Sequence, residues 1–552
     1  MASESRALLN EPTKILIEPT NPIDDRCINI GELILNTFKS KPDFIGQVDA
    51  KTGEKNTFQQ MRERSVKCAL WLKKFGVRRN DIVTVCTSNH LDTYIPYLAT
   101  LYIGAILTVW HEYRTINLRY YIQSKPKVIF TDIDKAPVIL NVAKLMNVST
   151  KIIVFKKKSK KAKQFESIKC ILNGDFDEDE IDTFSCTKLE SSKDTAVVLF
   201  SSSTIGYIRK HVAIPHVFFT SPSNQEMPSM SSNDVGLWVE SLHWNISLLL
   251  TVRCILSYVK AVKINEFSNP SLEECFCDII HKYKVNWVFL KMGMVEQFSN
   301  FEIFKKYDMS SLRQMIFSCR NTPYICFPSL ITVLPNTIVT RAYCLPETGM
   351  IAFHQNRGEE LFSYISANVV LVIADFNTSL PLPIFKYGFI CCKSPSLTNG
   401  YFNSTTGDII AATDNNGWFH TDEIGYCNDE GGICIVERGK EGNVISYRNY
   451  QFPALEIEQV LLQHPEIEEA VVVPIYNVFD GHHPMALVVA KEGSKITEED
   501  IIKFVAWFVD DRKQLHAGVL FMKKLANFHS GHYDRRKICR YAKEHVFNAK
   551  RI

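Results

Sequence analysis

The sequence predicts an α/β protein, with a large N-terminal part built on parallel strands and a smaller α+β part at its C-terminus. Short apolar runs alternate with amphipathic stretches over the first part, as in βαβ units and a largely parallel sheet. The length of 552 residues exceeds what one hydrophobic core ordinarily holds, so two or more domains are expected. The apolar fraction of 46%, with 22% charged residues, is that of a soluble globular protein.

The first part shows its alternation in a clear order along the chain. Strands are predicted at residues 82–85, 128–131, 152–155 and 195–200. A helix is predicted between the first two strands, over residues 91–101. The lysine-rich run at residues 156–163 is typical of a solvated loop, with a membrane-surface or nucleic-acid patch as the alternative.

The C-terminal part shows a different pattern of predicted helices and strands. A helix is predicted over residues 454–464, because Pro465 follows, and strands over 470–475 and 485–490. Thr497 and Asp500 form a capping-box-like start for a further helix. Its predicted apolar face consists of Ile501, Phe504, Val505 and Phe508.

Charge and segment composition exclude several classes of protein. The formal net charge of +3 gives no reason to expect nucleic acid as a partner. The chain shows neither a secretory signal nor a transmembrane run, since the best apolar stretch, residues 246–262, contains Arg253 and Lys260. The sixteen cysteines lack metal-ligand spacing, so free and mostly buried thiols in an intracellular protein are expected.

A hydroxyl-rich turn follows the strand at residues 195–200. It contains Ser201, Ser202, Thr204 and Arg209, and hydroxyls beside a cation suit phosphate oxygens. Taken alone, such a turn is more often an ordinary loop. Three further stretches follow it in order, at residues 341–349, 417–426 and 437–440.

These four stretches, in this order, resemble the signature motifs of the adenylate-forming superfamily, which includes acyl-CoA synthetases, 4-coumarate–CoA ligases and beetle luciferases. The resemblance runs from about residue 31 to residue 552. It implies an N-terminal domain over 1–436 of stacked βα sheets with a β-barrel-like part, a hinge at 437–440 and a mobile C-terminal domain over 441–552. It also implies that a carboxylic acid, fatty or aryl, is joined to ATP and then transferred to coenzyme A.

The resemblance assigns roles to particular residues. Glu347 corresponds to the carboxylate that helps to hold Mg²⁺, and Tyr343 to the aromatic residue near adenine. His243 and Trp244 correspond to the motif beside the acyl pocket, although plain core packing is the alternative for both. Glu423 would bind the ribose, Arg438 would contact the nucleotide, and Lys440 would be the hinge. The loop that holds the β- and γ-phosphates would consist of Ser201, Ser202, Thr204 and Arg209.

One departure affects the reacting centre directly. The superfamily's C-terminal motif ends in Thr-Gly-Lys, and here His532 stands at the position of that catalytic lysine. An imidazole of ordinary pKa is only about a quarter protonated at pH 7, and it is shorter than a lysine side chain. Losing one preorganised donor of this kind costs about 10²–10³ in rate.

Other departures are spread over both half-reactions. Pro346 lacks the hydroxyl and the N–H of the usual threonine before Glu347, and Asp422 stands where glycine is expected. Glu423 is one methylene longer than the usual aspartate. The other replaced positions are Ser203, Ile205, Arg320, Asn321, Ser446 and Asn449.

Three hypotheses about function follow. The chain is an acid–CoA ligase whose chemistry is impaired; or it is a non-catalytic relative that binds a nucleotide, an acyl ligand or a protein partner; or it oxygenates an adenylate as luciferases do. The last requires the first half-reaction too. The chain ends in Lys550, Arg551 and Ile552 rather than in a peroxisomal Ser-Lys-Leu signal, so a cytoplasmic location is expected, with the peroxisome as alternative.

Overall fold

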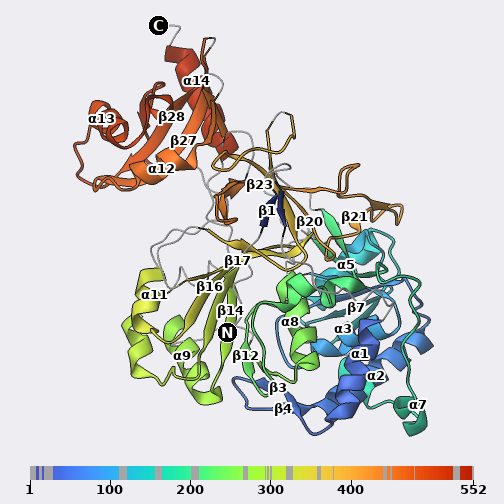
Figure 1. The fold of residues 1–552 in the computed structure, drawn as a ribbon. Helices are drawn as coiled ribbons and strands as arrows, with labels where there is room; N and C mark the ends of the chain where they lie inside the picture. Colours follow the sequence, from blue (N-terminus) through green and yellow to red (C-terminus); the bar gives the residue numbers. More distant parts are fainter. Residues whose placement is uncertain are drawn as a thin grey trace. The chain divides into compact units, whose positions relative to one another are not determined.

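The computed structural model divides the chain into two compact units (Figure 1). Unit 1 comprises residues 1–7, 17–370 and 393–419, and unit 2 comprises residues 8–16, 371–392 and 420–552. The structure describes residues 8–10, 15–17, 29–110, 118, 121–155, 164–200, 210–264, 271–291, 294, 298, 301–318, 327–356, 362–376, 378–438, 444–447, 450–477, 479–525 and 535–549. None of the helices in this part of the chain combines the length and the apolar character of a membrane-spanning segment.

Among the described residues, unit 1 contains two nine-stranded sheets. The first sheet has the order β22 (Ile409–Ile410), β21 (Gly400–Phe402), β11 (His211–Pro215), β10 (Thr195–Phe200), β6 (Ile106–Val109), β5 (Ile82–Cys86), β7 (Val128–Thr131), β8 (Lys151–Val154) and β9 (Glu166–Ser167). Its strands from β10 to β9 are parallel, which confirms the predicted βα alternation.

The second sheet of unit 1 positions most of the candidate site. Its order is β18 (Tyr364–Ile365), β17 (Gly349–Asn356), β16 (Ile338–Leu345), β15 (Gln314–Ser318), β14 (Trp287–Lys291), β12 (Val235–Leu237), β13 (Lys260–Lys263), β3 (Ile45–Asp49) and β4 (Lys55–Thr57). The strands from β16 to β3 are parallel, so their carboxyl ends meet at one edge.

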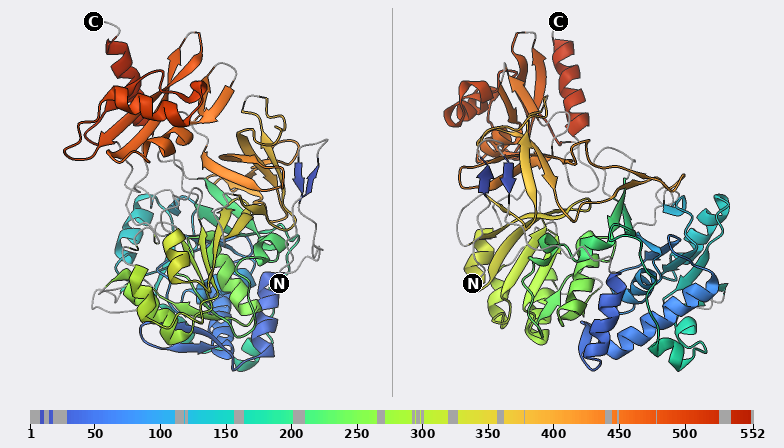
Figure 2. Two further views of the ribbon diagram at one scale, coloured as in Figure 1. Left: turned by 60° about the vertical axis from the view of Figure 1, so that its left-hand side comes forward. Right: turned by 45° about the vertical axis from the view of Figure 1, so that its right-hand side comes forward.

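Helix α8 (Asn245–Leu256) lies between the two sheets (Figures 1 and 2). Leu248 and Val252 belong to the core of the first sheet, while Ile246 and Leu250 pack with Trp287 of the second. A helix buried on all sides is apolar all round, which explains the long apolar run in the sequence. Its buried Arg253 is held by the carbonyl oxygens of Gln225, Met227 and Pro228.

The other helices of unit 1 pack against the two sheets and, in part, against the same core as α8. Helix α2 begins with a capping box at Thr57 and Gln60 and ends at Gly76 in a left-handed conformation. The helices are α1 (Ile30–Ser40), α2 (Phe58–Phe75), α3 (Tyr94–Tyr102), α5 (Ala136–Leu145), α6 (Ile168–Leu172), α7 (Glu178–Asp182), α9 (Leu272–Tyr283) and α11 (Phe327–Val333).

Unit 2 contains a six-stranded and a five-stranded sheet among its described residues. The six-stranded sheet corresponds to the predicted β-barrel-like part, and its strands are β1 (Leu8–Asn10), β2 (Ile15–Ile17), β19 (Val370–Ala374), β20 (Gly388–Lys393), β23 (Phe419–Cys427) and β24 (Ile433–Arg438). The five-stranded sheet consists of β26 (Tyr450–Pro453), β25 (Val444–Tyr447), β28 (Gly481–Ala490), β27 (Ile467–Asn477) and β29 (Val519–Phe521). Helices α12 (Leu455–Leu461), α13 (Glu498–Phe508) and α14 (Arg535–Ala549) complete the predicted α+β part.

A buried ion pair links helices of unit 2. Glu458 of α12 accepts a hydrogen bond from Arg535, and Glu458 is only 3% exposed. Arg535 also donates to the carbonyl oxygen of Val472, whose N–H donates to Glu458. This pair fixes the start of α14, because Arg535 is the first residue of that helix.

Several local predictions are confirmed and some are wrong. The capping box of Thr497 and Asp500 is present, and Ile501 and Val505 are fully buried. Phe508, predicted on the same apolar face, is instead 54% exposed, because it is the last residue of the helix and lies outside the core that buries Ile501 and Val505. The helix predicted from residue 91 begins at Tyr94, since Thr93 bonds back to His90 in a turn.

The cysteines that the structure describes, from Cys68 to Cys539, are free thiols, as expected. The predicted loop at residues 156–163 and most of the predicted hinge lie outside the described residues. The predicted domain boundaries, 1–436, 437–440 and 441–552, therefore stay a prediction.

Candidate functional site

Glu347 lies in the turn that joins β16 to β17, at the carboxyl edge of the second sheet of unit 1. Gly349 closes this turn with a φ of +70°, a conformation that glycine adopts without strain. A Cβ atom on Gly349 would lie 2.7 Å from the side-chain nitrogen of Asn224. The turn therefore requires glycine for its backbone conformation and for its close approach to Asn224.

Four polar contacts hold this turn in place. The side-chain oxygen of Asn224 accepts a bond from Met350 N (2.8 Å), and Asn245 donates to the carbonyl of Leu345 (3.1 Å). Thr398 N donates to the carbonyl of Glu347 (2.7 Å), and the hydroxyl of Ser396 donates to the carbonyl of Thr348 (2.6 Å). The Glu347 side chain is 9% exposed. The carboxylate is thus held on a turn fixed from three separate segments.

Tyr343 lies on β16, four residues before Glu347, and pairs with Ala352 of β17. Its side chain is 2% exposed. A ring covered to this extent offers no open face, so stacking on adenine requires a neighbouring side chain to move. The role predicted for Tyr343 stays a prediction.

Glu423 lies on β23 of unit 2 and is completely buried. Its N–H donates to the hydroxyl of Thr421 (3.1 Å), which in turn donates to the carbonyl of Ile390 (2.8 Å). In the ladder with β24, Glu423 is paired with Arg438. The two residues predicted to contact the nucleotide are therefore cross-strand neighbours in one sheet.

Asp422, directly before Glu423, has a φ of +59° inside β23. This is the left-handed region, which aspartate tolerates better than most residues and glycine tolerates best. The glycine that the family resemblance leads one to expect here would adopt this backbone conformation without strain. The Asp422 side chain is exposed.

Substitutions at position 422 should separate backbone conformation from side-chain chemistry. We expect Asp422→Gly to leave the free energy of unfolding within about 0.5 kcal/mol, since relief of strain and loss of unfolded-state restriction offset one another. Asp422→Val should lower it by about 2 kcal/mol, because a β-branched residue resists positive φ. Urea unfolding of the three proteins measures both changes, and equal stability of the two variants would contradict the assignment.

His243 and Trp244 lie between β12 and α8, with Trp244 at the N-cap position of the helix but without a capping hydrogen bond from its side chain. The hydroxyl of Ser241 and His243 Nδ1 are 2.7 Å apart, and the Trp244 ring packs edge-on against Phe289 at 5.3 Å. Trp244 rests on the core around Trp238 and Trp287, which accords with the core-packing alternative. Both side chains are partly exposed at the same sheet edge as Glu347.

Two residues beside His243 were not predicted as site residues. Glu240 and Lys291 form an ion pair of 2.9 Å next to the imidazole. The sequence does single out Lys291, because this charged residue directly follows the apolar run at residues 287–290. The partner could not be identified from the sequence, since Glu240 is 51 positions away.

The described residues fit the groups that the family resemblance implies to different degrees. They contain no cluster of three or more His, Cys, Asp or Glu side chains that could hold a metal ion. A single carboxylate such as Glu347 still suits Mg²⁺, which usually takes one or two carboxylates together with phosphate oxygens and water. The Glu423 carboxylate has the chemistry to accept hydrogen bonds from ribose hydroxyl groups, but it is completely buried, so a ribose reaches it only if a neighbouring group moves.

Several predicted site residues cannot be compared with the structure. His532 lies outside the described residues, just before Arg535 and α14. Arg438 is described only in its backbone. The other predicted residues outside the described part are Ser201, Ser202, Ser203, Thr204, Ile205, Arg209, Arg320, Asn321, Lys440 and Asn449.

Comparisons with known proteins agree with this architecture. Residues 35–402 match the AMP-binding enzyme family, and residues 456–531 match the AMP-binding enzyme C-terminal domain. Luciferin 4-monooxygenase of Photinus pyralis is 26% identical over 541 residues, covering 94% of this chain and 95% of the relative. 4-Coumarate–CoA ligase 3 of Arabidopsis thaliana is 26% identical over 514 residues, covering 90% and 88%.

Solved structures share the fold. ATP-bound MatB of Rhodopseudomonas palustris has a TM-score of 0.75 at 18% identity, covering 93% of this chain and 99% of that one. A luciferase-like enzyme of the nonluminescent mealworm Zophobas morio has a TM-score of 0.68 at 23% identity, covering 78% and 100%. The first family match alone spans two thirds of the sequence and contains Tyr343 and Glu347. The chain therefore belongs to the AMP-binding enzyme family.

Proposed function

We propose that this chain binds ATP and a carboxylic acid and joins them slowly into an acyl-adenylate. The observation that carries the proposal is the turn around Glu347, which remains fixed by Asn224, Asn245, Ser396 and Thr398. A turn held by so many contacts keeps a carboxylate in one place before any ligand arrives. Transfer of the acyl group to coenzyme A is the second half-reaction that the resemblance implies.

Three predicted site residues would have separate roles in forming the adenylate. Glu347 would hold Mg²⁺, which neutralises the charge of the phosphate oxygens when bound. Glu423 would accept hydrogen bonds from ribose hydroxyls. His532 would face the reacting carboxylate and α-phosphate, where a neutral imidazole donates a weaker hydrogen bond than a lysine ammonium.

A second candidate is a relative that binds these ligands without joining them. Pro346 and Asp422 favour it, because each directly precedes one of the two carboxylate residues of the predicted site. Pro346 has no N–H to donate to a phosphate oxygen beside Glu347. The two candidates differ in whether any adenylate forms.

Single-turnover adenylate formation from labelled ATP, with a panel of fatty and aryl acids, distinguishes the candidates. We expect a measurable but slow reaction from the unaltered protein. His532→Lys should raise its rate by less than about tenfold, because one restored donor cannot act fully where neighbouring positions also misplace the ligands. Glu347→Gln should abolish the reaction.

Equilibrium binding of ATP to the same samples provides the control. Binding of ATP without adenylate from either protein would support the second candidate. Failure of a folded sample to bind ATP at all would contradict both.

A further inference from the structure

Helix α13 exposes aromatic side chains to solvent instead of burying them. Trp507 is 86% exposed and Phe508 is 54% exposed, although large aromatic side chains are ordinarily well covered. Phe504 packs against the ring of Phe508 at 5.0 Å and against the ring of His464 at 4.7 Å. Residues three and four apart in a helix are neighbours on its surface. Phe504, Trp507 and Phe508 therefore form one surface, hereafter the aromatic face of α13.

The apolar surface of α13 is wider than the core that the helix covers. Ile501 and Val505 are completely buried in a core shared with α12 and the five-stranded sheet. From Val505 to Trp507, the apolar side chains span about 160° of the helix circumference, since successive residues are about 100° apart. Part of this stripe packs on the sheet, and the aromatic face stays exposed beside it. Exposed apolar patches with polar borders mark sites of interaction with other molecules.

Acidic residues lie at both ends of the aromatic face. They are Glu498, Glu499 and Asp500 in the first turn of α13, and Asp510 and Asp511 just after the helix. Lys503 is the only lysine or arginine among residues 498–511, and its ammonium pairs with Glu499 at 2.7 Å. The stretch 455–468, which contains α12, adds no lysine or arginine. This side of the C-terminal part is therefore strongly acidic.

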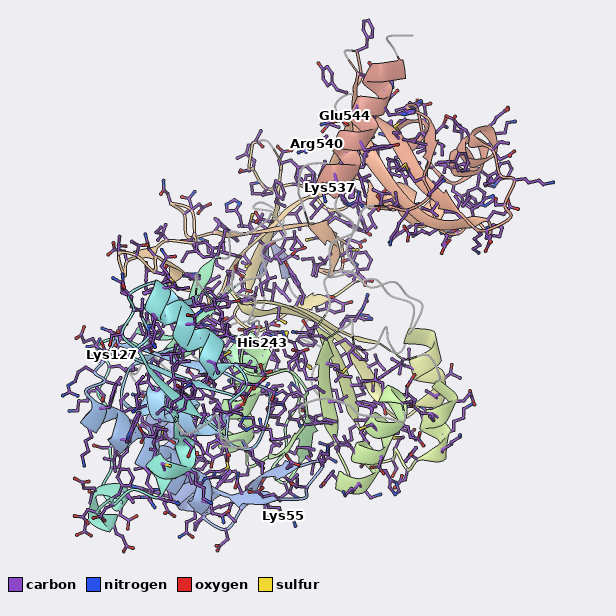
Figure 3. All side chains as sticks on the ribbon, turned by 180° about the vertical axis from the view of Figure 1, so that it is seen from behind. Lys55, Lys127, His243, Lys537, Arg540 and Glu544 are labelled. Carbon is purple, nitrogen blue, oxygen red and sulfur yellow. The ribbon has the colours of Figure 1, made fainter. Side chains whose placement is uncertain are left out.

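The other face of the five-stranded sheet carries the opposite charge. Helix α14 packs on the face that Val471 presents, and α13 packs on the face that Val472 presents. Because successive residues of a strand point to opposite faces, the two helices lie on opposite sides of this sheet (Figure 1). The exposed charged side chains of α14 include Lys537, Arg540, Lys543 and Glu544, of which Lys537, Arg540 and Glu544 are labelled in Figure 3. The acidic character therefore belongs to the α13 side of the sheet.

We propose that the aromatic face of α13 docks a basic amphipathic helix of a partner protein. The apolar side chains of such a helix cover Trp507 and Phe508, which removes a large aromatic surface from water. Its lysine or arginine side chains meet the carboxylates at the two ends of the face, so the charges of the two surfaces are complementary. Neither α12 nor α13 carries a residue predicted for the adenylate site. The docking function is therefore additional to adenylate formation.

The charge around the aromatic face disfavours two other occupants. An anionic membrane surface would be repelled by the five carboxylates at its ends. A second copy of the chain that presented its own α13 would bring acidic residues against acidic residues. A second copy that presented α14 would supply basic side chains, but Tyr541 is the only large apolar side chain exposed on the described part of α14. A partner with both an apolar stripe and basic residues fits the face better.

The test is fluorescence anisotropy of three labelled synthetic peptides, each titrated with the full chain. The first is an amphipathic helix of about five turns made of leucine and lysine. The second has glutamate in place of lysine, and the third has the composition of the first in an order that gives no apolar face. At low ionic strength, we expect the first peptide to bind at least about tenfold more tightly than either of the others. Its binding should weaken as salt is added, because salt screens the paired charges.

Substitutions assign the binding to the aromatic face and to its acidic ends. Trp507→Gln should weaken binding of the first peptide by about tenfold or more, because tryptophan often dominates the binding energy of an interface. Its urea-unfolding midpoint should stay unchanged, since the side chain is so exposed. Glu499→Gln combined with Asp511→Asn should weaken binding by about threefold and reduce its salt dependence. Tyr541→Gln is the matched control, because it removes an exposed ring from the opposite side of the same sheet, and it should leave binding unchanged.

Several results would overturn the proposal. Equal binding of the lysine and glutamate peptides would show that charge does not select the partner, and absence of binding by all three peptides would show that the face docks no such helix. Peptide binding that Trp507→Gln leaves intact would place the contact elsewhere. Sedimentation with phosphatidylserine vesicles, or dimer formation in sedimentation velocity, would assign the face to a membrane or to a second copy if Trp507→Gln abolished it.

Discussion

Gly349→Ala is expected to lower the free energy of unfolding by about 3 kcal/mol and to abolish adenylate formation. Two costs combine at this position. Alanine resists the φ of +70°, and its Cβ would press on the Asn224 side chain. Asn224 is completely buried and bonds the carbonyl of Phe218 at 2.8 Å, so it cannot move away without losing that bond. Urea unfolding and the single-turnover assay measure the two effects.

Gly53→Ala is the matched control for this prediction. Gly53 has a similar φ of +73°, but no atom lies within 4 Å of the position of an added Cβ. Gly53→Ala should therefore lower the free energy of unfolding only through the backbone conformation, by about 1 kcal/mol. If Gly349→Ala were no more destabilising than Gly53→Ala, the contact with Asn224 would not constrain the turn.

Lys263→Met is expected to raise the free energy of unfolding by about 2 kcal/mol at pH 7. Lys263 is 1% exposed, and burial lowers the pKa of its ammonium to about 8. This shift from an ordinary value of 10.5 corresponds to about 3 kcal/mol of cost for the charged form. The hydrogen bond to Asn89 (3.2 Å) and the Trp238 ring at 4.3 Å oppose part of that cost, and methionine loses both contacts.

The difference in stability between Lys263→Met and the unaltered protein should depend on pH, because the charge of Lys263 does. Below pH 8 both the folded and the unfolded chain carry the charge, so the full cost is present. Between pH 8 and 10.5 the unfolded chain holds a proton that the folded chain has lost, and the stability of the unaltered protein rises with pH. The advantage of Lys263→Met should therefore shrink over this window, reach zero before its upper end and become a disadvantage of about 1 kcal/mol at pH 10.5.

Fluorescence-monitored urea unfolding at a series of pH values measures this dependence. Lys260→Met, on the same strand with a partly exposed side chain, is the control and should change stability by less than about 0.5 kcal/mol. A Lys263→Met advantage that is the same at every pH would show that packing, rather than the buried charge, is responsible.

Local patterns in the sequence predicted those helices and strands well whose formation depends on residues close together in the chain. The strands at residues 82–85, 128–131 and 195–200 are β5, β7 and β10, because buried parallel strands consist of unbroken apolar runs. The capping box at Thr497 formed as predicted, since both of its hydrogen bonds are made within four residues. The order of the motifs likewise identified the family.

The same local patterns could not predict which face of an element is covered. Phe508 continues the apolar face of α13 but lies beyond the core that buries Ile501 and Val505. Lys263 ends an apolar strand, which is ordinarily where a chain meets water, yet it is buried beside Trp238. Burial depends on which other elements pack nearby, and that information is spread over the whole chain.

The sequence by itself determined the α/β class, the main parallel strands and membership of the family, because these depend on periodicity and on the order of short motifs. Only the tertiary structure decided that Asn224 closes on Gly349, that Asp422 adopts a left-handed backbone and that Glu240 meets Lys291. Asn224 and Gly349 are 125 positions apart, and Glu240 and Lys291 are 51 positions apart. Such pairs are brought together by strand order, which no local pattern of residues encodes.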